Sequence, residues 1–348
     1  MRPGGAFVEK EACFRNKITW FSFIFSVLVV WVHSANGELF LGKSGYARSV
    51  ILFERFLGNT IAQIAVPGFF MMSGYLFYRN FHWKKLGEKW KSRIKSLLMP
   101  FLLWNTIYYL GYVIGSRLPF VTDIVEKGTV PFEPETIFNA VIRYQYNYVF
   151  WYLYQLILLV FLAPMVYGIL KHKGLGGVML GILYYFVQKG RVIPYLNLDA
   201  LLYYGMGAYG GIHGKLLVEG IWTQKKEIVG AGMISVAVAF LFLPWPRGLT
   251  AKVCYRIMMP IGLWLAVDAS RLPKIKPWME YNFFLYAIHF ALVRLVNKTV
   301  AIVLWGYWPI PVALFLFMPM LMIWVSSFVG SQMKRWTPRL WGVLNGGR

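Results

Sequence analysis

The side chain with the clearest chemical potential in this sequence is His33, near the end of an apolar stretch, residues 18–36. It is the one titratable group of that stretch, and Ser22, Ser26 and His33 follow one another at helical spacings of four and seven. A histidine inside a membrane-spanning helix is costly unless it faces protein, water or a ligand, so we take His33 as a candidate functional residue. The alternative is an imidazole that merely hydrogen-bonds a neighbouring helix.

A second histidine occurs in residues 279–294, where Asn282, Tyr286 and His289 are separated by four and three residues. On a helix these three side chains form one polar stripe along an otherwise apolar surface. With a rise of about 1.5 Å per residue, His289 would lie near the middle of the membrane, and His33 past the middle toward the outer side.

Two further stretches contain residue types that could contact a ligand. Residues 66–79 include Ser73 and Gly74, whose small size lets a neighbouring helix or a ligand approach closely, and helix packing explains them equally well. Residues 91–105 run from a basic segment into an apolar one, which would place cations where a phosphate-rich ligand could dock. A basic anchor on the cytoplasmic side of a membrane gives the same pattern.

The composition excludes a typical soluble globule. Of the 348 residues 58% are hydrophobic and 14% are charged, whereas soluble domains have about 25% charged residues. The net charge of +22 would suggest nucleic acid in a soluble protein. Because most of the basic residues lie between apolar stretches, membrane topology and anionic lipids explain the charge better, and we expect no nucleic-acid partner.

The apolar stretches predict an all-α integral membrane protein with about ten helices in one bundle, since a span needs about 20 apolar residues. The clearest spans are residues 18–36, 60–78, 96–115, 149–170, 282–304 and 309–330. Four weaker spans are residues 174–188, 196–212, 228–244 and 253–269. Basic residues precede the first span, follow the second and follow the last, which predicts that both termini are cytoplasmic. The loop 116–148 has a slight acidic excess and suits the outer side.

The chain lacks the marks of several other protein classes. No low-complexity linker divides it, so we expect one domain over residues 1–348. Cys13 and Cys254 have no metal-ligand spacing, and we expect no metal. A Gly-rich nucleotide loop, a nucleophile-elbow motif and a zinc-protease motif are all missing from the sequence.

Taken together, several motifs resemble the membrane acyltransferase-3 family, and they occur in the same order over nearly the whole chain. They are the histidine that ends the first span, AVPGFFMMSGYLFYR, RIKSLLMPFLLWN, FWYLYQLILLVFLAP and YNFFLYAIHF. The resemblance implies a ten-helix membrane fold and transfer of acyl groups, usually acetyl from acetyl-CoA, to hydroxyls of cell-surface sugars or lipids. It also implies location in the cell membrane.

By position, His33 matches the family's histidine in the first span, which the resemblance implies to be catalytic. Arg93 matches a basic position of the inner loop that is expected to help bind the donor. The sequence departs from the family in two places. An arginine expected eleven residues before the histidine is Ser22 here, and a second inner-loop arginine is replaced by Ser96, beside the basic Lys95.

The resulting hypothesis is O-acyl transfer, in which neutral His33 acts as general base on an acceptor hydroxyl. Burial in a low dielectric favours the neutral imidazole. An acyl-histidine intermediate is an alternative mechanism, and a transporter of lipid-linked sugars or a non-catalytic membrane subunit are alternative functions. Arg93 and Lys95 would bind the acyl-CoA phosphates, and a long pantetheine arm would have to reach the outer-side histidine. Five residues are candidates for lining the substrate cavity: Ser73, Asn105, Trp151, Tyr154 and His289.

Overall fold

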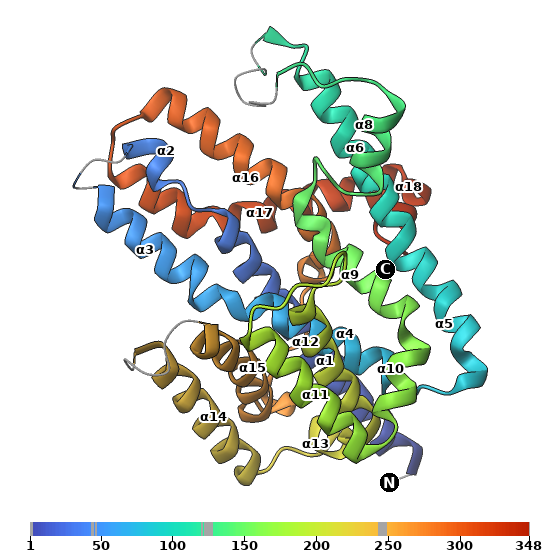
Figure 1. Cartoon of the computed structure of the whole chain (residues 1–348). Helices are drawn as coiled ribbons and strands as arrows, with labels where there is room; N and C mark the ends of the chain where they lie inside the picture. Colours follow the sequence, from blue (N-terminus) through green and yellow to red (C-terminus); the bar gives the residue numbers. More distant parts are fainter. Residues whose placement is uncertain are drawn as a thin grey trace. The chain divides into compact units, whose positions relative to one another are not determined.

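The computed structural model is built from helices (Figure 1), and it describes residues 3–42, 45, 47–119, 121, 128–242 and 249–347. Apart from one isolated bridge, the described residues contain no β-structure. This confirms the all-α class. Residues 122–127 of the predicted outer loop and the first two residues of the chain lie outside the described part.

Five helical stretches in the described residues are long and apolar enough to cross a membrane, or six if one bent helix pair counts as a span. The five are Glu9–Leu41, Ala47–Tyr78, Trp83–Gly115, Pro277–Leu304 and Pro309–Trp336. The bent pair joins Tyr148–Phe161 to Ala163–Leu170 at an angle of 65°. These stretches contain all six of the clearest predicted spans.

The four weaker spans also correspond to helices, but to short ones. They are α11 (Lys173–Gln188), α12 (Leu198–His213), α14 (Gln224–Phe242) and α15 (Leu249–Ala266), of 16, 16, 19 and 18 residues. None of them passes the same test of length, hydropathy and charge content. The count of ten spans and the cytoplasmic location of both termini therefore stay predictions.

Contacts divide the chain into two compact units, each assembled from three separate segments. Unit 1 comprises Met1–Ser26, Ala62–Leu86 and Phe161–Glu280, and unit 2 comprises Val27–Ile61, Gly87–Val160 and Tyr281–Arg348. The single domain over residues 1–348 stays a prediction.

Besides α11, α12, α14 and α15, unit 1 contains the first part of α1 (Pro3–His33), most of η1 (Ile61–Ile64), α4 (Ala65–Tyr78), η2 (Trp83–Lys85), α10 (Ala163–Leu170), α13 (Lys215–Glu219), η5 (Ala269–Arg271) and most of η6 (Pro277–Tyr281). Unit 2 contains the end of α1, α2 (Gly37–Leu41), α3 (Ala47–Asn59), most of α5 (Leu86–Arg93), the π-helical η3 (Ile94–Leu98), α6 (Met99–Gly115), α8 (Pro134–Val141), η4 (Tyr148–Phe150), most of α9 (Trp151–Phe161), α16 (Asn282–Leu304), α17 (Pro309–Trp336) and α18 (Pro338–Leu344).

In unit 1, α4 and α12 pack with their backbones in close approach. A Cβ atom at Gly74 would overlap the carbonyl oxygen of Tyr204, and one at Gly207 would overlap that of Met71. Glycine is the residue type that permits such an approach. Of the two explanations for the small residues in 66–79, helix packing therefore applies to Gly74.

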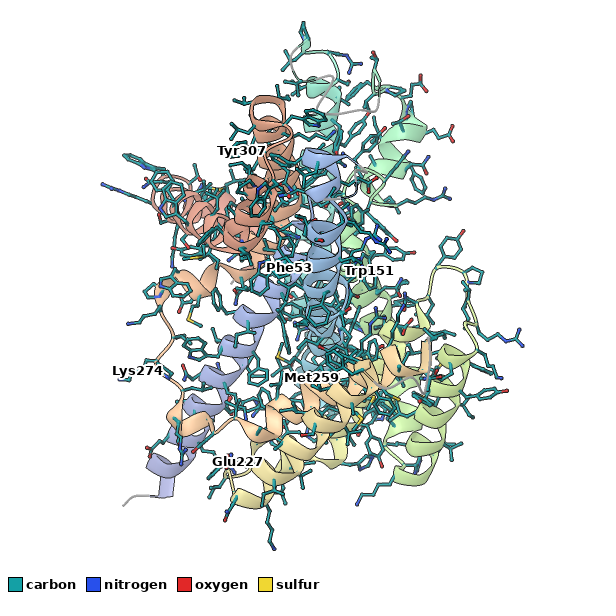
Figure 2. The ribbon with its side chains drawn as sticks, turned by 90° about the vertical axis from the view of Figure 1, so that its left-hand side faces the viewer. Phe53, Trp151, Glu227, Met259, Lys274 and Tyr307 are labelled. Carbon is teal, nitrogen blue, oxygen red and sulfur yellow. The ribbon has the colours of Figure 1, made fainter. Side chains whose placement is uncertain are left out.

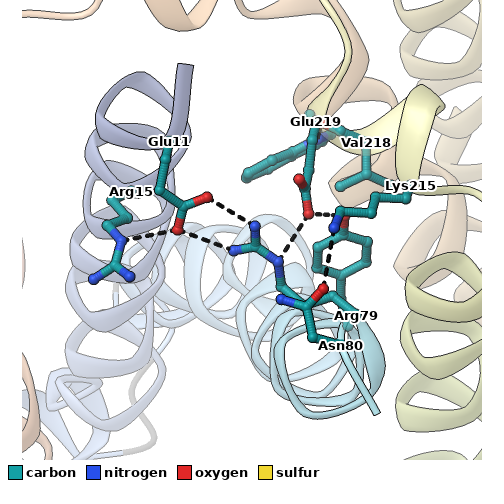
Figure 3. A network of polar contacts seen from close by, with 9 residues as sticks. Glu11, Arg15, Arg79, Asn80, Lys215, Val218 and Glu219 are labelled. Atoms are coloured by element: carbon teal, nitrogen blue, oxygen red, sulfur yellow. Dashed lines mark hydrogen bonds and ion pairs between the residues drawn. The ribbon is translucent and has the colours of Figure 1, made fainter. Parts of the chain in front are cut away.

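Unit 1 also contains a half-buried network of charges at the end of α4 (Figure 3). Arg79 forms ion pairs of 2.8 Å with Glu11 of α1 and of 2.9 Å with Glu219 of α13, and Tyr75 donates a hydrogen bond of 2.6 Å to Glu219. Although burial lowers the pKa of the Arg79 guanidinium, Glu11 and Glu219 raise it above its ordinary value. Arg79 is thus a cation with two carboxylate partners within unit 1.

In unit 2, α1, α16 and α17 share an apolar core. Its fully buried members are Val30, Leu285, Val293, Met318 and Met322. Figure 2 labels three landmarks of this unit: Phe53 on α3, Trp151 at the start of α9, and Tyr307 in the connection between α16 and α17. The apolar core shared by α1, α16 and α17 fixes the end of α1, where His33 lies, against α16.

Candidate active site

His33 is the last residue of α1 and is half-buried in unit 2. Its Nδ1 atom lies 2.9 Å from the hydroxyl of Tyr148. The imidazole centroid lies 5.7 Å from the ring of Tyr148, 5.4 Å from that of His289 and 5.6 Å from that of Phe290. The predicted catalytic residue is thus partly accessible and is surrounded by three rings from η4 and α16.

His289 presents an unpaired nitrogen beside His33. Its side chain is completely buried on α16, and its Nδ1 lies 2.7 Å from the carbonyl oxygen of Tyr286. Because a carbonyl oxygen accepts and does not donate, Nδ1 carries the hydrogen, and Nε2 of the uncharged ring offers a lone pair. Nε2 is buried and has no hydrogen-bond partner within the described part of the chain. The two predicted histidines therefore lie next to each other, and one of them has a free proton-accepting atom.

Asn105 anchors the segment that leads to Tyr148. Its side chain, which is completely buried on α6, donates from Nδ2 to the carbonyl oxygen of Val141 at 3.0 Å. Its Oδ1 accepts from Nδ2 of the buried Asn147 at 3.2 Å. Both functional ends of this amide contact protein, so its contacts hold the connection between α8 and η4. The predicted role of Asn105 in lining a substrate cavity remains untested.

Trp151 and Tyr154 are both half-buried on α9, directly after Tyr148. The ring of Tyr154 lies 5.3 Å from that of Tyr144. One residue before Trp151, Phe150 stacks on Tyr286 at 5.3 Å. The start of α9 is therefore an aromatic surface within the same unit as His33. Stacking of a sugar ring on it stays a prediction.

Arg93 and Lys95 lie where α5 continues into the π-helical segment Ile94–Leu98. Arg93 is half-buried and Lys95 is exposed. Because residues two positions apart on a helix do not face each other, the two cations point to different sides of it. Single-turn π segments in longer helices frequently occur at functional sites. Donor binding by these two residues stays a prediction.

Ser73 is the one predicted site residue that belongs to unit 1, where it is half-buried on α4. Unit 1 also contains a pocket of about 210 Å³, between α1, α4, α12, α13 and α15. Its walls are almost entirely apolar and include Phe21, Met71 and Trp264, and they include none of the predicted site residues.

Tyr148 and Phe290 are neighbours of His33 that the sequence did not predict. Phe290 follows His289 directly, and Tyr148 stands two residues before the aromatic motif that begins at Phe150. The sequence offered one signal for Tyr148, which is the closeness of its phenol to a predicted site motif. Its contact with His33 joins residues 115 positions apart, however, and local spacing cannot reveal such a contact.

The long apolar helices and the histidines placed on two of them define a helical integral membrane protein. A family model described as an acyltransferase domain of the acyltransferase-3 type matches residues 15–330, and the chain belongs to this family. The matched region covers most of both units and includes every predicted site residue.

Among curated proteins, the chain is similar to the succinoglycan biosynthesis protein ExoH of Rhizobium meliloti (strain 1021). The two are 25% identical over 225 residues, which is 60% of this chain. The match spans 57% of the length of that relative. No solved structure matches the chain significantly.

Proposed function

We propose that this protein is a membrane O-acyltransferase that transfers an acyl group, in particular acetyl, from acyl-CoA to a hydroxyl of a cell-surface polysaccharide or glycolipid. The observation that carries the proposal is the environment of His33, which combines partial accessibility with contacts to Tyr148 and His289. Membership of the acyltransferase-3 family supports the reaction type, and the name of the Rhizobium relative supports a polysaccharide acceptor.

In the proposed reaction, Nε2 of His33 removes the proton from the acceptor hydroxyl. The acceptor oxygen attacks the thioester carbonyl carbon, and a C–O bond forms. The tetrahedral intermediate then collapses, the C–S bond breaks, and the leaving thiolate takes the proton from the imidazolium. For Nε2 to act as the base, Nδ1 must carry the hydrogen and donate it to the Tyr148 oxygen, which fits their separation of 2.9 Å.

The remaining predicted residues take supporting roles in this proposal. Arg93 and Lys95 bind the phosphates of the donor. Trp151 and Tyr154 stack on the sugar of the acceptor, whereas Asn105 and His289 border the path of the substrates within unit 2. Ser73 of unit 1 stays a separate candidate for substrate binding. No metal ion takes part in the proposed reaction.

The test is His33→Ala, expressed in a strain that lacks the native gene, with mass spectrometry of acyl groups on the surface polysaccharide. Loss of the acyl groups, with the protein present in the membrane at its normal level, is the expected result, and it corresponds to at least about 100-fold for a general base. His172→Ala, at an exposed histidine that precedes α11, is the matched control and should retain acylation. Undiminished acylation in the His33 variant would refute the proposal.

A further inference from the structure

A carboxylate on α3 holds the backbone that directly follows His33. Glu54 is 3% exposed, and its oxygens accept hydrogen bonds from the backbone N–H of Asn36, at 3.2 Å, and of Gly37, at 2.9 and 3.1 Å. In the described part of the chain it has no basic partner. A buried carboxylate is costly, so these backbone donors and Glu54 depend on each other.

A second helix holds the same backbone from another side. Asn297 of α16, which is 5% exposed, donates from Nδ2 to the carbonyl oxygen of Ser34 at 3.3 Å. Its Oδ1 accepts from Nδ2 of Asn36 at 3.0 Å. The residues from Ser34 to Gly37 are thus bonded to α3 by a carboxylate and to α16 by an amide.

The close approach of Glu54 also depends on the size of residue 37. A Cβ atom at Gly37 would lie 3.0 Å from Oε2 of Glu54 and 3.1 Å from Cγ1 of Val50. Any larger side chain would push the carboxylate or its helix away by a few tenths of an ångström. Gly37 therefore permits the contact geometrically, and Glu54 supplies the charge.

We propose that Glu54 is a positioning residue of the active site: by fixing the backbone after α1, it sets the direction in which the His33 imidazole meets Tyr148 and His289. This assignment rests on the proposed function of His33. A carboxylate accepts at both oxygens, which two successive N–H groups require. The amide of glutamine would place an NH₂ group against one of them. Glu54→Gln should therefore rotate or loosen the ring of His33 while leaving the fold intact.

The experiment compares the wild type with Glu54→Gln in protein labelled with ¹⁵N-histidine, using the ring-nitrogen resonances in solid-state NMR and His33→Ala to assign the signal of His33. We expect the His33 resonance to shift or broaden, and those of His172 and His213 in unit 1 to stay unchanged. Turnover should fall about 10- to 100-fold with the KM for acyl-CoA within twofold, because small misplacements of a catalytic group have effects of this size. Glu135→Gln, at an exposed glutamate of α8, is the matched control.

Gly37→Ala displaces the same contact without removing a charge, and it serves as the second variant if Glu54→Gln does not fold. It should move the same resonance in the same direction. An unchanged His33 resonance in a folded variant would overturn the positioning role, whether or not turnover falls. If His33→Ala retains activity, the proposed function fails, but the resonances still decide whether Glu54 orders the ring.

Discussion

The contact between Tyr148 and His33 gives a prediction whose size follows from the structure. Tyr148→Phe removes one hydrogen bond of 2.9 Å and leaves the ring contacts of the residue in place. A neutral hydrogen bond contributes about 0.5–1.5 kcal/mol net. Because Tyr148 is 49% exposed, water can replace part of what is lost. We therefore expect a loss of about 1 kcal/mol in transition-state stabilisation, which corresponds to a fall in kcat of about fivefold.

The assay is the initial rate at which labelled acetyl from acetyl-CoA is incorporated into polysaccharide, in membrane vesicles with equal amounts of each variant. The KM for acetyl-CoA should not change, because the phenol orients the base and does not bind the donor. Tyr307→Phe, at an exposed tyrosine of unit 2, is the matched control and should behave as the wild type. A fall smaller than twofold, or one as large as that of His33→Ala, would show that the hydroxyl does not act by orienting the imidazole.

Two predictions concern stability in unit 1. Arg79→Met leaves Glu11 and Glu219 without their shared cation and should lower the free energy of unfolding by about 3 kcal/mol. This value is the low end of the range for a broken buried pair, because the Glu11 side chain is 27% exposed. Thermal unfolding in detergent should show a lowered midpoint, whereas Lys84→Met, which removes an exposed cation, should not; equal midpoints would contradict the network's role. Gly74→Ala pushes α4 away from α12 and should lower the free energy of unfolding by about 1–3 kcal/mol. Gly181→Ala on α11, where a Cβ meets open space, should not destabilise the protein; if both variants unfold alike, the close approach of α4 and α12 is not what Gly74 provides.

The helices that carry His33 and His289 could be predicted because they are long and almost wholly apolar. The helical positions of His33 and His289 follow from the apolar stretches around them, and the structure places both on helices that pass as spans. The spacing of Tyr286 and His289 predicted a common polar stripe, and one continuous helix, α16, carries both residues. Local periodicity suffices for such features because they depend on neighbours within a few turns.

The partners of these residues could not be predicted, because they come from segments far apart in the chain. Glu54 is one of several carboxylates that lie outside the predicted spans. Nothing in the sequence around it distinguishes it from Glu38, which lies nearer to His33 in the chain. Arg79 directly follows a predicted span, as a basic residue of an inner loop would, but it is paired with carboxylates 68 residues before it and 140 after it. Burial and pairing decide the role of a charged residue, and sequence spacing contains neither.

One helix, α16, connects the separate parts of the proposed active site. Tyr286 donates a hydrogen bond of 2.7 Å to the carbonyl oxygen of Val149, next to Tyr148. His289 meets the ring of His33, and Asn297 holds the carbonyl oxygen of Ser34. Asn297 lies eleven positions after Tyr286, about 16.5 Å along the helix at 1.5 Å per residue. This helix therefore sets the distance between the segment that carries the phenol and the segment that carries the imidazole.

If α16 serves mainly to bring Tyr148 and His33 together, the effects of Tyr286→Phe and Asn297→Ala on turnover should not be additive. Each substitution releases one side of the same contact, and once that contact is lost the second substitution removes little more. The double variant should therefore be only slightly slower than the slower single variant, with a coupling energy of about 0.5 kcal/mol or more. The measurement is a double-mutant cycle on the acetyl incorporation rate. Strict additivity would mean that the two hydrogen bonds act on turnover independently, and that α16 does not place the imidazole and the phenol as a pair.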